Sequence, residues 1–163
     1  MEIYLSLGSN MGDRMVYLNE AIKELAAADV TIVEESSVYE TAPLGPQDQG
    51  WYLNAVLEVA TSDSPSDLLA KILEIERLLG RIRKQRWGER CIDIDILYYQ
   101  QKIIDSQALV VPHPEIANRK FVLTPMVEIA PWFTHPVRKR TQTELLAMCS
   151  DHLDCRRTEY QLL

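Results

Sequence analysis

The fold of this chain is indicated first by the stretch Cys91-Ile92-Asp93-Ile94-Asp95-Ile96-Leu97-Tyr98-Tyr99. Its residues alternate with a period of two, which is typical of a β-strand whose successive side chains point to opposite faces. The face expected to pack a core carries Ile92, Ile94, Ile96 and Tyr98. The opposite face is expected to carry Cys91, Asp93, Asp95 and Leu97. Aspartate is disfavoured in strands, so two of them on one face suggest a role beyond folding.

Upstream of this strand, the sequence predicts a strand, a helix, two strands and a second helix. The expected elements cover residues 3–7, 14–27, 30–40, 51–61 and 64–79. Ser64 and Pro65 are typical of a helix start, and Gly80 is placed to end that helix. Together with the strand at 91–99, this order is the split βαβ pattern of a ferredoxin-like α+β fold. We therefore expect a βαββαβ core, an antiparallel sheet with helices packed on one face.

Beyond Gln100 the pattern is weaker and predicts a C-terminal extension. We expect a short hairpin, a loop through Pro112-His113-Pro114, an extended or helical piece at 121–129 and a final helix at 143–148. A length of 163 residues fits one domain, so residues 1–163 are expected to form a single catalytic domain.

Composition restricts the class of protein. The net charge of -7 argues against general nucleic-acid binding, which usually leaves a basic footprint. No apolar run is long enough to span a membrane, and the first residues lack the features of a signal peptide. The three cysteines, Cys91, Cys149 and Cys155, show no metal-type spacing and fit a reducing compartment. We expect a cytoplasmic monomer that acts on small molecules.

Asp93 and Asp95 are the first candidates for chemistry. Strand geometry places their Cα atoms about 7 Å apart on one face, so the two carboxylates can jointly hold Mg²⁺. Just upstream, five cations occur within ten residues: Arg81, Arg83, Lys84, Arg86 and Arg90. Acids that hold a metal beside guanidinium groups suit a metal–polyphosphate ligand. The alternative is an ordinary solvated strand and loop with weak surface ion pairs.

Three further segments are more ambiguous. The turn Gly8-Ser9-Asn10-Met11-Gly12 lacks the ending of a phosphate-binding Walker loop, and a tight strand-to-helix connection explains it equally well. His113 is held between two prolines and could donate to a phosphate, or be a plain loop residue. Tyr52 and Asn54 share a strand face and could support a flat heterocycle, or be ordinary strand residues.

Several long motifs, in order, make the chain resemble 6-hydroxymethyl-7,8-dihydropterin pyrophosphokinase, a folate-pathway family. The similarity runs from residue 5 to about residue 131. The motifs are Leu5-Ser6-Leu7-Gly8-Ser9-Asn10, Pro43-Leu44-Gly45-Pro46-Gln47-Asp48-Gln49, Tyr52-Leu53-Asn54-Ala55, Gly80-Arg81-x-Arg83, Arg86-Trp87-Gly88-x-Arg90-x-x-Asp93-Ile94-Asp95-Ile96-Leu97, Val111-Pro112-His113-Pro114 and Asn118-Arg119-x-Phe121-Val122-Leu123.

The resemblance implies a reaction and a set of roles. The family transfers the terminal diphosphate of ATP to the hydroxymethyl group of the reduced pterin and releases AMP. It implies that Asp93 and Asp95 hold two Mg²⁺ ions and that Arg81 and Arg90 are catalytic. The residues implied to bind ATP are Glu76, Arg83, Arg86, Ile96, His113 and Arg119. Those implied to bind the pterin are Thr41, Pro43, Leu44, Tyr52, Asn54, Trp87 and Phe121, with the rings of Tyr52 and Phe121 enclosing the heterocycle.

The chain departs from the family pattern at a few positions. Pro114 stands where many members carry tyrosine, Ala42 replaces a frequent proline, and Ala108 and Val110 are apolar where some members offer polar contacts to ATP. Two other functions stay open on the residues alone. One is a different Asp-x-Asp metal–nucleotide transferase, such as a sugar transferase, although no Rossmann-type pattern supports it. The other is a ferredoxin-like binding module without catalysis.

Overall fold

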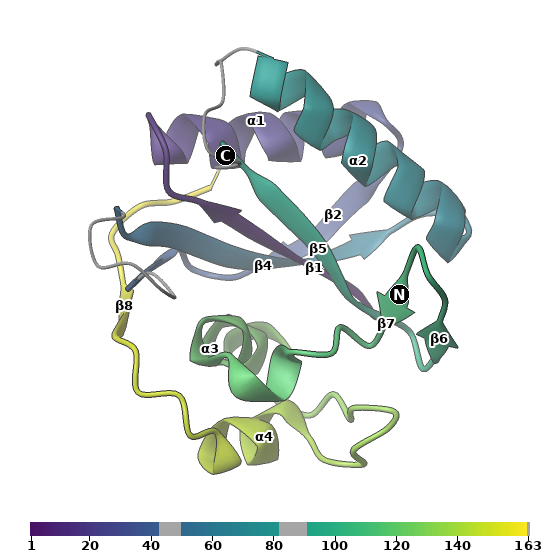
Figure 1. The fold of residues 1–163 in the computed structure, drawn as a ribbon, viewed down its shortest axis with the longest axis vertical. Coiled ribbons are helices and arrows are strands. Elements are labelled where there is room, and N and C mark those ends of the chain that lie inside the picture. The colour runs from purple at the N-terminus through teal and green to yellow at the C-terminus, as the bar shows by residue number, and fades with distance from the viewer. Residues whose placement is uncertain (43–49, 82–90, 163) are drawn as a thin grey trace.

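The computed structural model describes residues 1–42, 50–81 and 91–162, and for Arg81 only the backbone. The chain forms one central sheet with helices above and below it (Figure 1). In chain order the elements are β1 (Ile3–Ser9), α1 (Arg14–Ala27), β2 (Thr31–Glu35), β3 (Tyr39–Thr41), β4 (Tyr52–Ala60), α2 (Pro65–Arg81), β5 (Asp93–Tyr99), β6 (Ile104–Asp105), β7 (Val110–Val111), the 3₁₀ turn η1 (Ile116–Asn118), α3 (Lys120–Ile129), α4 (Gln142–Met148) and β8 (Cys155–Arg157).

The sheet has the strand order β5-β1-β4-β3-β8, and β2 also pairs with β4. Every pairing in it is antiparallel. β2 and β3 lie along successive parts of β4, so together they act as one interrupted strand. This arrangement confirms the predicted α+β fold, with its βαββαβ core and antiparallel sheet. β6 and β7 form the expected short hairpin.

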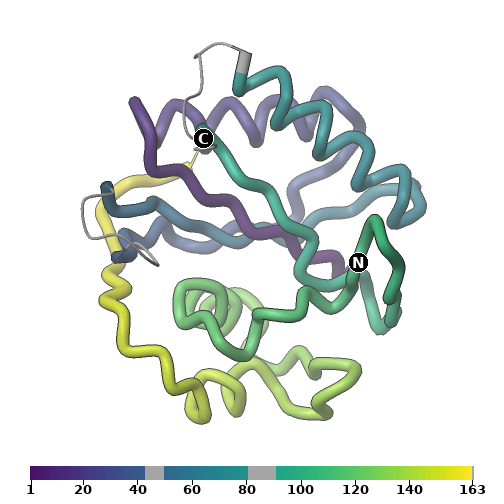
Figure 2. The backbone as a smooth tube through the Cα atoms, in the orientation of Figure 1, coloured from purple at the N-terminus to yellow at the C-terminus, as the bar shows by residue number. Residues whose placement is uncertain are grey.

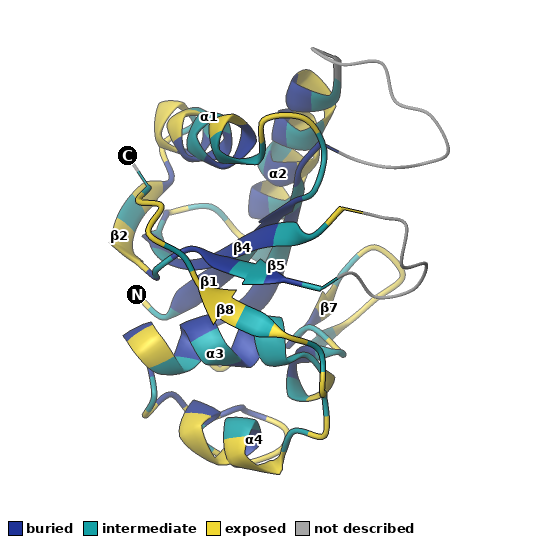
Figure 3. Ribbon diagram, turned by 90° about the vertical axis from the view of Figure 1, so that its left-hand side faces the viewer, coloured by how far each residue is buried: buried dark blue, intermediate teal, exposed yellow. Residues whose placement is uncertain are grey.

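The first layer of helices was predicted closely. α1 and α2 lie on one face of the sheet and turn their buried sides toward it (Figure 3). The Asp13 side chain caps α1 through the Val16 amide, and the Ser64 hydroxyl accepts from the Asp67 amide at the start of α2. The prediction that Gly80 ends α2 is wrong, because the helix continues to Arg81. A Cβ at Gly80 would meet no atom of the described residues within 4 Å, so among these residues the position is an open helical site.

The opposite face of the sheet is not open, as the one-sided prediction implied. α3 and α4 cover part of it (Figure 1) and enclose a second core with β1 and β5. Tyr4, Tyr98 and Phe133 meet there as aromatic pairs, with ring centroids 4.7 to 6.3 Å apart. The second core makes the fold a sheet between two unequal helical layers.

Two of the strand-face assignments need correction. The register between β1 and β5 shifts after Tyr4, so Tyr4 pairs with Tyr98 while Leu5 pairs with Ile96. This bulge places Leu97 and Tyr98 in the same core under α3, and Tyr98 does not join the isoleucine face. Cys91 precedes β5 and is buried in the core under α1 and α2, not beside the aspartates. Ile92, Ile94, Ile96, Asp93 and Asp95 keep the predicted alternation.

The sequence did not predict β8. After α4 the chain returns along the side of the molecule to the sheet (Figure 2) and pairs with β3. β8 is a strand of only three residues, Cys155–Arg157, which is too short to show a periodicity. None of the helices in the described part of the chain has the length and hydrophobicity needed to cross a bilayer.

Candidate active site

Residues paired across three neighbouring strands form the candidate site, and each set of paired residues is called a row. Gly8 on β1 pairs with Asn54 on β4 and with Asp93 on β5. One row further along, Ser6 pairs with Val56 and with Asp95. Because adjacent strands lie about 4.8 Å apart, Asn54 and Asp93 stand about 10 Å apart across a small central residue. The sheet therefore presents an amide on one side and two carboxylates on the other, with open space between them.

A cavity of about 230 Å³ occupies this space. β1, β3, β4 and β5 form its floor, and residues at the start of α3 form another wall. Of the residues predicted to act in the site, the cavity is lined by Thr41, Tyr52, Asn54, Asp93, Asp95, Arg119 and Phe121. Segments more than 100 residues apart in the sequence therefore meet at a single place. Ser6, Leu7, Gly8 and Ala42 complete the lining.

Asn54 and Thr41 form a buried polar pair in the cavity floor. The Asn54 amide nitrogen donates to the Thr41 hydroxyl at 2.6 Å, and the two residues are 7% and 2% exposed. This hydrogen bond fixes the amide in one orientation. A buried amide held in this way is suited to recognising a hydrogen-bonding edge of a ligand.

Gly8 leaves room for that amide. A Cβ at this position would lie 2.8 Å from the Asn54 Oδ1 atom, which is closer than two such atoms can approach. Ser9, next in the chain, donates from its hydroxyl to the Cys91 carbonyl at 2.6 Å and so joins the end of β1 to the approach of β5. Gly8 and Ser9 therefore position their neighbours in the sheet. In the described structure they form the end of β1, which leads toward α1.

The α3 wall supplies an aromatic ring and a cation. Phe121 lies in the first turn of α3, and Arg119 is the residue that precedes the helix. The Arg119 guanidinium lies 5.8 Å from the centroid of the Phe121 ring, within the range of a cation–π contact. Since Tyr52 comes from the sheet and Phe121 from the helix, the cavity has aromatic rings from two different layers.

His113 lies close to this group. Its backbone amide donates to the Leu97 carbonyl at 3.0 Å, and its Nδ1 accepts from the Glu115 amide at 3.1 Å. Because Nδ1 is an acceptor, the neutral ring carries its proton on Nε2. Burial lowers the pKa of His113; the charge of Asp95 acts in the opposite direction, and Arg119 lowers it further. His113 is therefore a neutral donor at pH 7.

Glu76 and Ile96, predicted to lie by the nucleoside, occupy a different environment. The Glu76 carboxylate accepts from the Ile94 amide at 2.8 Å and ties α2 to β5. Ile96 is 4% exposed and packs in the core under α1 and α2. Neither residue lines the cavity, so their proposed contact with the nucleoside stays a prediction.

Several predicted residues lie outside the described residues. These are Pro43, Leu44, Arg83, Arg86, Trp87 and Arg90. Arg81 is the last residue of α2, and its side chain is not described. The structure therefore brings together the acids, the amide pair, the rings and Arg119, and leaves the arginine segment as a prediction.

Sequence reasoning assigned no role to Ser6, Leu7 or Gly8, all of which line the cavity. A signal was present for two of them. Ser6 lies in the strand predicted at residues 3–7, Gly8 directly follows that strand, and both are small where Tyr4, two residues before Ser6, is large. Small residues at successive positions of one face indicate a hollow in that face, but only the strand pairing shows what surrounds it.

Several known proteins are similar to this chain. Residues 4–131 match the family model described as 7,8-dihydro-6-hydroxymethylpterin-pyrophosphokinase (HPPK). The 2-amino-4-hydroxy-6-hydroxymethyldihydropteridine pyrophosphokinase of Haemophilus influenzae is 42% identical over 150 residues, which cover 91% of this chain and 93% of that protein. The protein of the same name from Bacillus subtilis is 46% identical over 127 residues, covering 77% of this chain and 76% of that protein.

Longer proteins also match. The folic acid synthesis protein fol1 of Pneumocystis carinii is 38% identical over 150 residues, and the match spans 92% of this chain but only 20% of that protein. A crystal structure of Plasmodium falciparum HPPK-DHPS superposes with a TM-score of 0.71 at 16% identity, covering 90% of this chain and 42% of the other. At that identity, the likeness establishes the fold. The family match over most of the chain establishes the family: this chain belongs to the 6-hydroxymethyl-dihydropterin pyrophosphokinases of folate synthesis.

Proposed function

We propose that the chain carries out the pyrophosphokinase reaction of its family in the cavity between β1, β4, β5 and α3. In that reaction the pterin hydroxymethyl oxygen attacks the β-phosphorus of ATP. The bond from the β-phosphorus to the oxygen that bridges to the α-phosphorus breaks, and AMP leaves. The observation that carries the proposal is that one cavity holds a buried amide pair, two aromatic rings and two carboxylates.

The amide end of the cavity suits the pterin. Tyr52 and Phe121 provide flat apolar surfaces from two layers of the fold, which fit the faces of a bicyclic heterocycle. Asn54, held by Thr41, would recognise the polar edge of the ring. Pro43, Leu44 and Trp87 are proposed to add contacts to the same substrate on the strength of the family motifs.

The carboxylate end suits magnesium. Asp93 and Asp95 line the cavity as a pair, and the described residues contain no group of three or more His, Cys, Asp or Glu side chains able to hold a metal alone. A pair of carboxylates fits Mg²⁺, which keeps several waters and takes its other ligands from substrate phosphates. We propose that Asp93 and Asp95 hold two Mg²⁺ ions, which would offset the charge that develops on the transferring phosphates.

We propose that cationic and donor groups bind the phosphates of ATP. Arg119 lines the cavity, and the neutral His113 offers its Nε2 proton. The family motifs assign Arg81 and Arg90 to catalysis and Arg83 and Arg86 to ATP, and we keep these roles as proposals. Phosphoryl transfer with a loose transition state depends mainly on positioning and charge stabilisation, which such a group of side chains supplies.

One assay tests the assignment. The full chain receives ATP, Mg²⁺ and 6-hydroxymethyl-7,8-dihydropterin, and the adenine product is followed. AMP together with pterin diphosphate is the expected result, and EDTA should abolish it. ADP as the product, or no turnover by a folded protein, would contradict the reaction. The alternative sugar transferase would require turnover of a nucleotide sugar, so that substrate is the parallel control.

We further propose that residues 1–163 act as a single catalytic domain, in the cytoplasm and as a monomer. β8 supports the first point, because this late strand completes the same sheet that holds the cavity. Cys91, Cys149 and Cys155 are all free thiols, which fits a reducing compartment. Sedimentation analysis of the purified protein tests the monomer, and a dimer would contradict it.

A further inference from the structure

The segment that follows α4 contacts both walls of the proposed pterin cavity. Its residues, 151–158, lie beyond the 4–131 range that matches the family model. No motif or predicted element covers them, apart from the cysteine at position 155. Their contacts nevertheless converge on the two elements that present Thr41 and Phe121.

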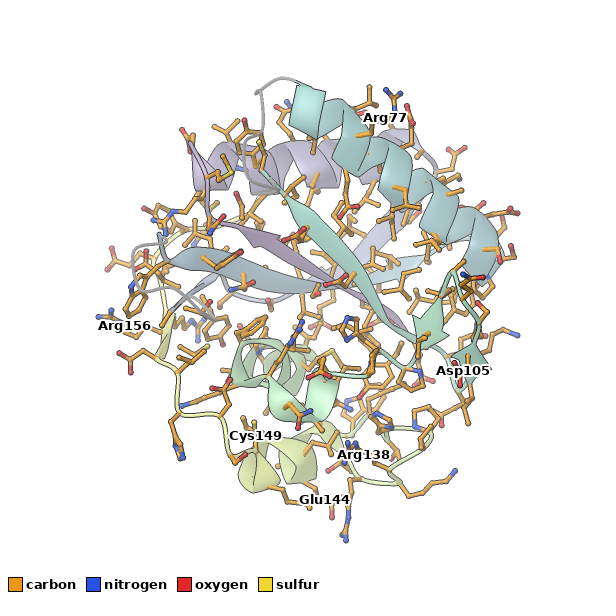
Figure 4. The ribbon with its side chains drawn as sticks, viewed as in Figure 1. Arg77, Asp105, Arg138, Glu144, Cys149 and Arg156 are labelled. Carbon is orange, nitrogen blue, oxygen red and sulfur yellow. The ribbon has the colours of Figure 1, made fainter. Side chains whose placement is uncertain are left out.

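The first contacts are with the sheet wall. β8 pairs with β3 so that Cys155 lies opposite Thr41, and the Ala42 amide donates to the Asp154 carbonyl at 3.1 Å. Thr41 in turn accepts the hydrogen bond that orients Asn54. Further along, Arg156 stacks on Trp51 with its guanidinium carbon 4.7 Å from the ring centroid. Arg156 lies at the outer side of β8, away from α4 (Figure 4). The backbone of Thr41 is thus held between β4 and β8.

The second contact is with the helical wall. The Lys120 amide at the start of α3 donates to the Asp151 Oδ2 atom at 3.0 Å. α3 has no side-chain cap from its own N-cap residue and no acid in its first turn, so Asp151 supplies the cap from 31 residues away. The other oxygen of Asp151 accepts from the Leu153 amide at 2.9 Å, which orients the carboxylate. The capped amide lies between Arg119 and Phe121 in the chain.

We propose that Asp151 is a positioning residue for the pterin site, and that residues 151–158 brace the walls that carry Thr41 and Phe121. The inference rests on the proposed pterin site. A carboxylate fixed by the chain beyond α4 holds the first turn of α3, and β8 holds the end of β3. The distance between the two walls is therefore set by one continuous segment that does not itself line the cavity.

The test compares two helix caps in the full chain. Asp151→Ala removes the cap of α3. Thr141→Ala removes the cap of α4, because the Thr141 hydroxyl accepts from the Glu144 amide. Both should lower the melting temperature. Only Asp151→Ala should raise the KM for the pterin. The expected rise is about five-fold, which corresponds to the free energy of one lost helix cap. Its KM for ATP should change less than about two-fold. Asp151→Asn keeps an acceptor oxygen and should restore most of the pterin KM.

The outcomes separate the brace from the site itself. Phe121→Ala, measured in parallel, should raise the pterin KM strongly; if it does not, the assignment of the pterin site fails first. If Phe121→Ala has its effect but Asp151→Ala leaves the pterin KM unchanged, the brace is wrong. An equal rise in Thr141→Ala would also overturn it, because the effect would then be general destabilisation. Should Asp151→Ala not fold, Asp151→Glu, whose longer side chain displaces the carboxylate, takes its place with the same expected direction.

Discussion

The two halves of the sheet face under α3 are built from the same three strands, but one half is packed as a core and the other forms a cavity. In the half that α3 and α4 close, the residues are large: Tyr4 on β1 pairs with Tyr98 on β5, and Phe133 packs against both rings. In the open half, two to four residues further along β1, Ser6 and Gly8 take the corresponding positions. Side-chain size on the central strand therefore determines where this face forms a core and where it forms a cavity.

The polar groups follow the same division. Where the side chains of β1 are small, β4 and β5 carry Asn54, Asp93 and Asp95 around the cavity. Where β1 carries a large side chain, a different polar group is enclosed. Gln142 donates to the Tyr98 hydroxyl at 2.9 Å and to the Phe133 carbonyl at 3.1 Å. Packing in the closed half fixes the frame in which the open half holds its carboxylates and amide. Substitutions in each half test this division.

The largest effect should come from the carboxylates of the open half. Asp93→Asn and Asp95→Asn should each lower turnover by about 10³-fold, because the proposed metal site loses charge where the phosphates react. The free energy of unfolding should stay close to that of the unmodified chain. AMP formation and denaturant unfolding measure the two quantities. The matched closed-half variant, Phe133→Leu, should lower stability and leave turnover of the folded protein intact. Near-normal turnover in either aspartate variant would remove the metal role.

Acid should destabilise the closed half through His135. This residue is 6% exposed, packs against Tyr98 with ring centroids 5.5 Å apart, and accepts at Nδ1 from the amides of Val137 and Arg138. Burial, with the charge of Arg138, lowers the pKa of His135 to about 4. The unfolded chain takes up this proton below pH ~6.5, before the folded chain does, so the contribution to stability is complete above that pH and is lost toward pH 4.

The loss attributable to His135 should be about 3 kcal/mol in the free energy of unfolding. His135→Asn keeps an acceptor for the two amides and cannot titrate, so its stability should fall less steeply between pH 6.5 and pH 4. Denaturant titrations at a series of pH values compare the two slopes. Identical slopes would show that His135 is not the titrating group.

Gly8→Ala should convert the edge of the open half toward closed packing. The added methyl group meets the Asn54 Oδ1 atom at 2.8 Å, so the amide must move. We expect the KM for the pterin to rise about tenfold, the equivalent of one misplaced hydrogen-bonding group, while the KM for ATP changes little. Gly80→Ala is the control, because that position is helical and open with respect to the described residues, so the variant should gain stability.

A double-mutant cycle sharpens the Gly8 prediction. In an Asn54→Ala background the amide is gone, so adding Gly8→Ala should have little further effect on the KM for the pterin. Additive effects of the two substitutions would mean that Gly8 acts on the site by another route than the Asn54 amide.

The smallest effect should distinguish the two tyrosines of the closed half. Within the described residues the Tyr4 hydroxyl is buried without a hydrogen-bond partner, whereas Tyr98 accepts from Gln142. Tyr4→Phe should therefore leave the free energy of unfolding unchanged or raise it slightly. Tyr98→Phe should lower it by about 1 kcal/mol. Equilibrium unfolding in urea measures both, and a larger loss in Tyr4→Phe would contradict the assignment.

Local patterns were sufficient for most of the fold. α1 was predicted at residues 14–27 and is observed there, because an amphipathic stripe defines it over its whole length. The faces of β4 were also correct, with Leu53, Ala55, Leu57 and Val59 in one core and Val56 in the other. The β5 bulge, the second helical layer and β8 were not predictable, since each depends on a pairing between distant segments.

For the candidate site, local sequence patterns were enough to identify the chemical groups. Alternation in β5 placed Asp93 and Asp95 on one face, and the motifs singled out Tyr52, Asn54, Arg119 and Phe121 together. The folded structure was needed to show that Gly8 makes room for Asn54, that Thr41 orients it, and that Asp151 caps α3. The physical reason is that side-chain alternation is a local property of a strand. A close approach, a buried hydrogen bond or a remote cap exists only after the chain has folded.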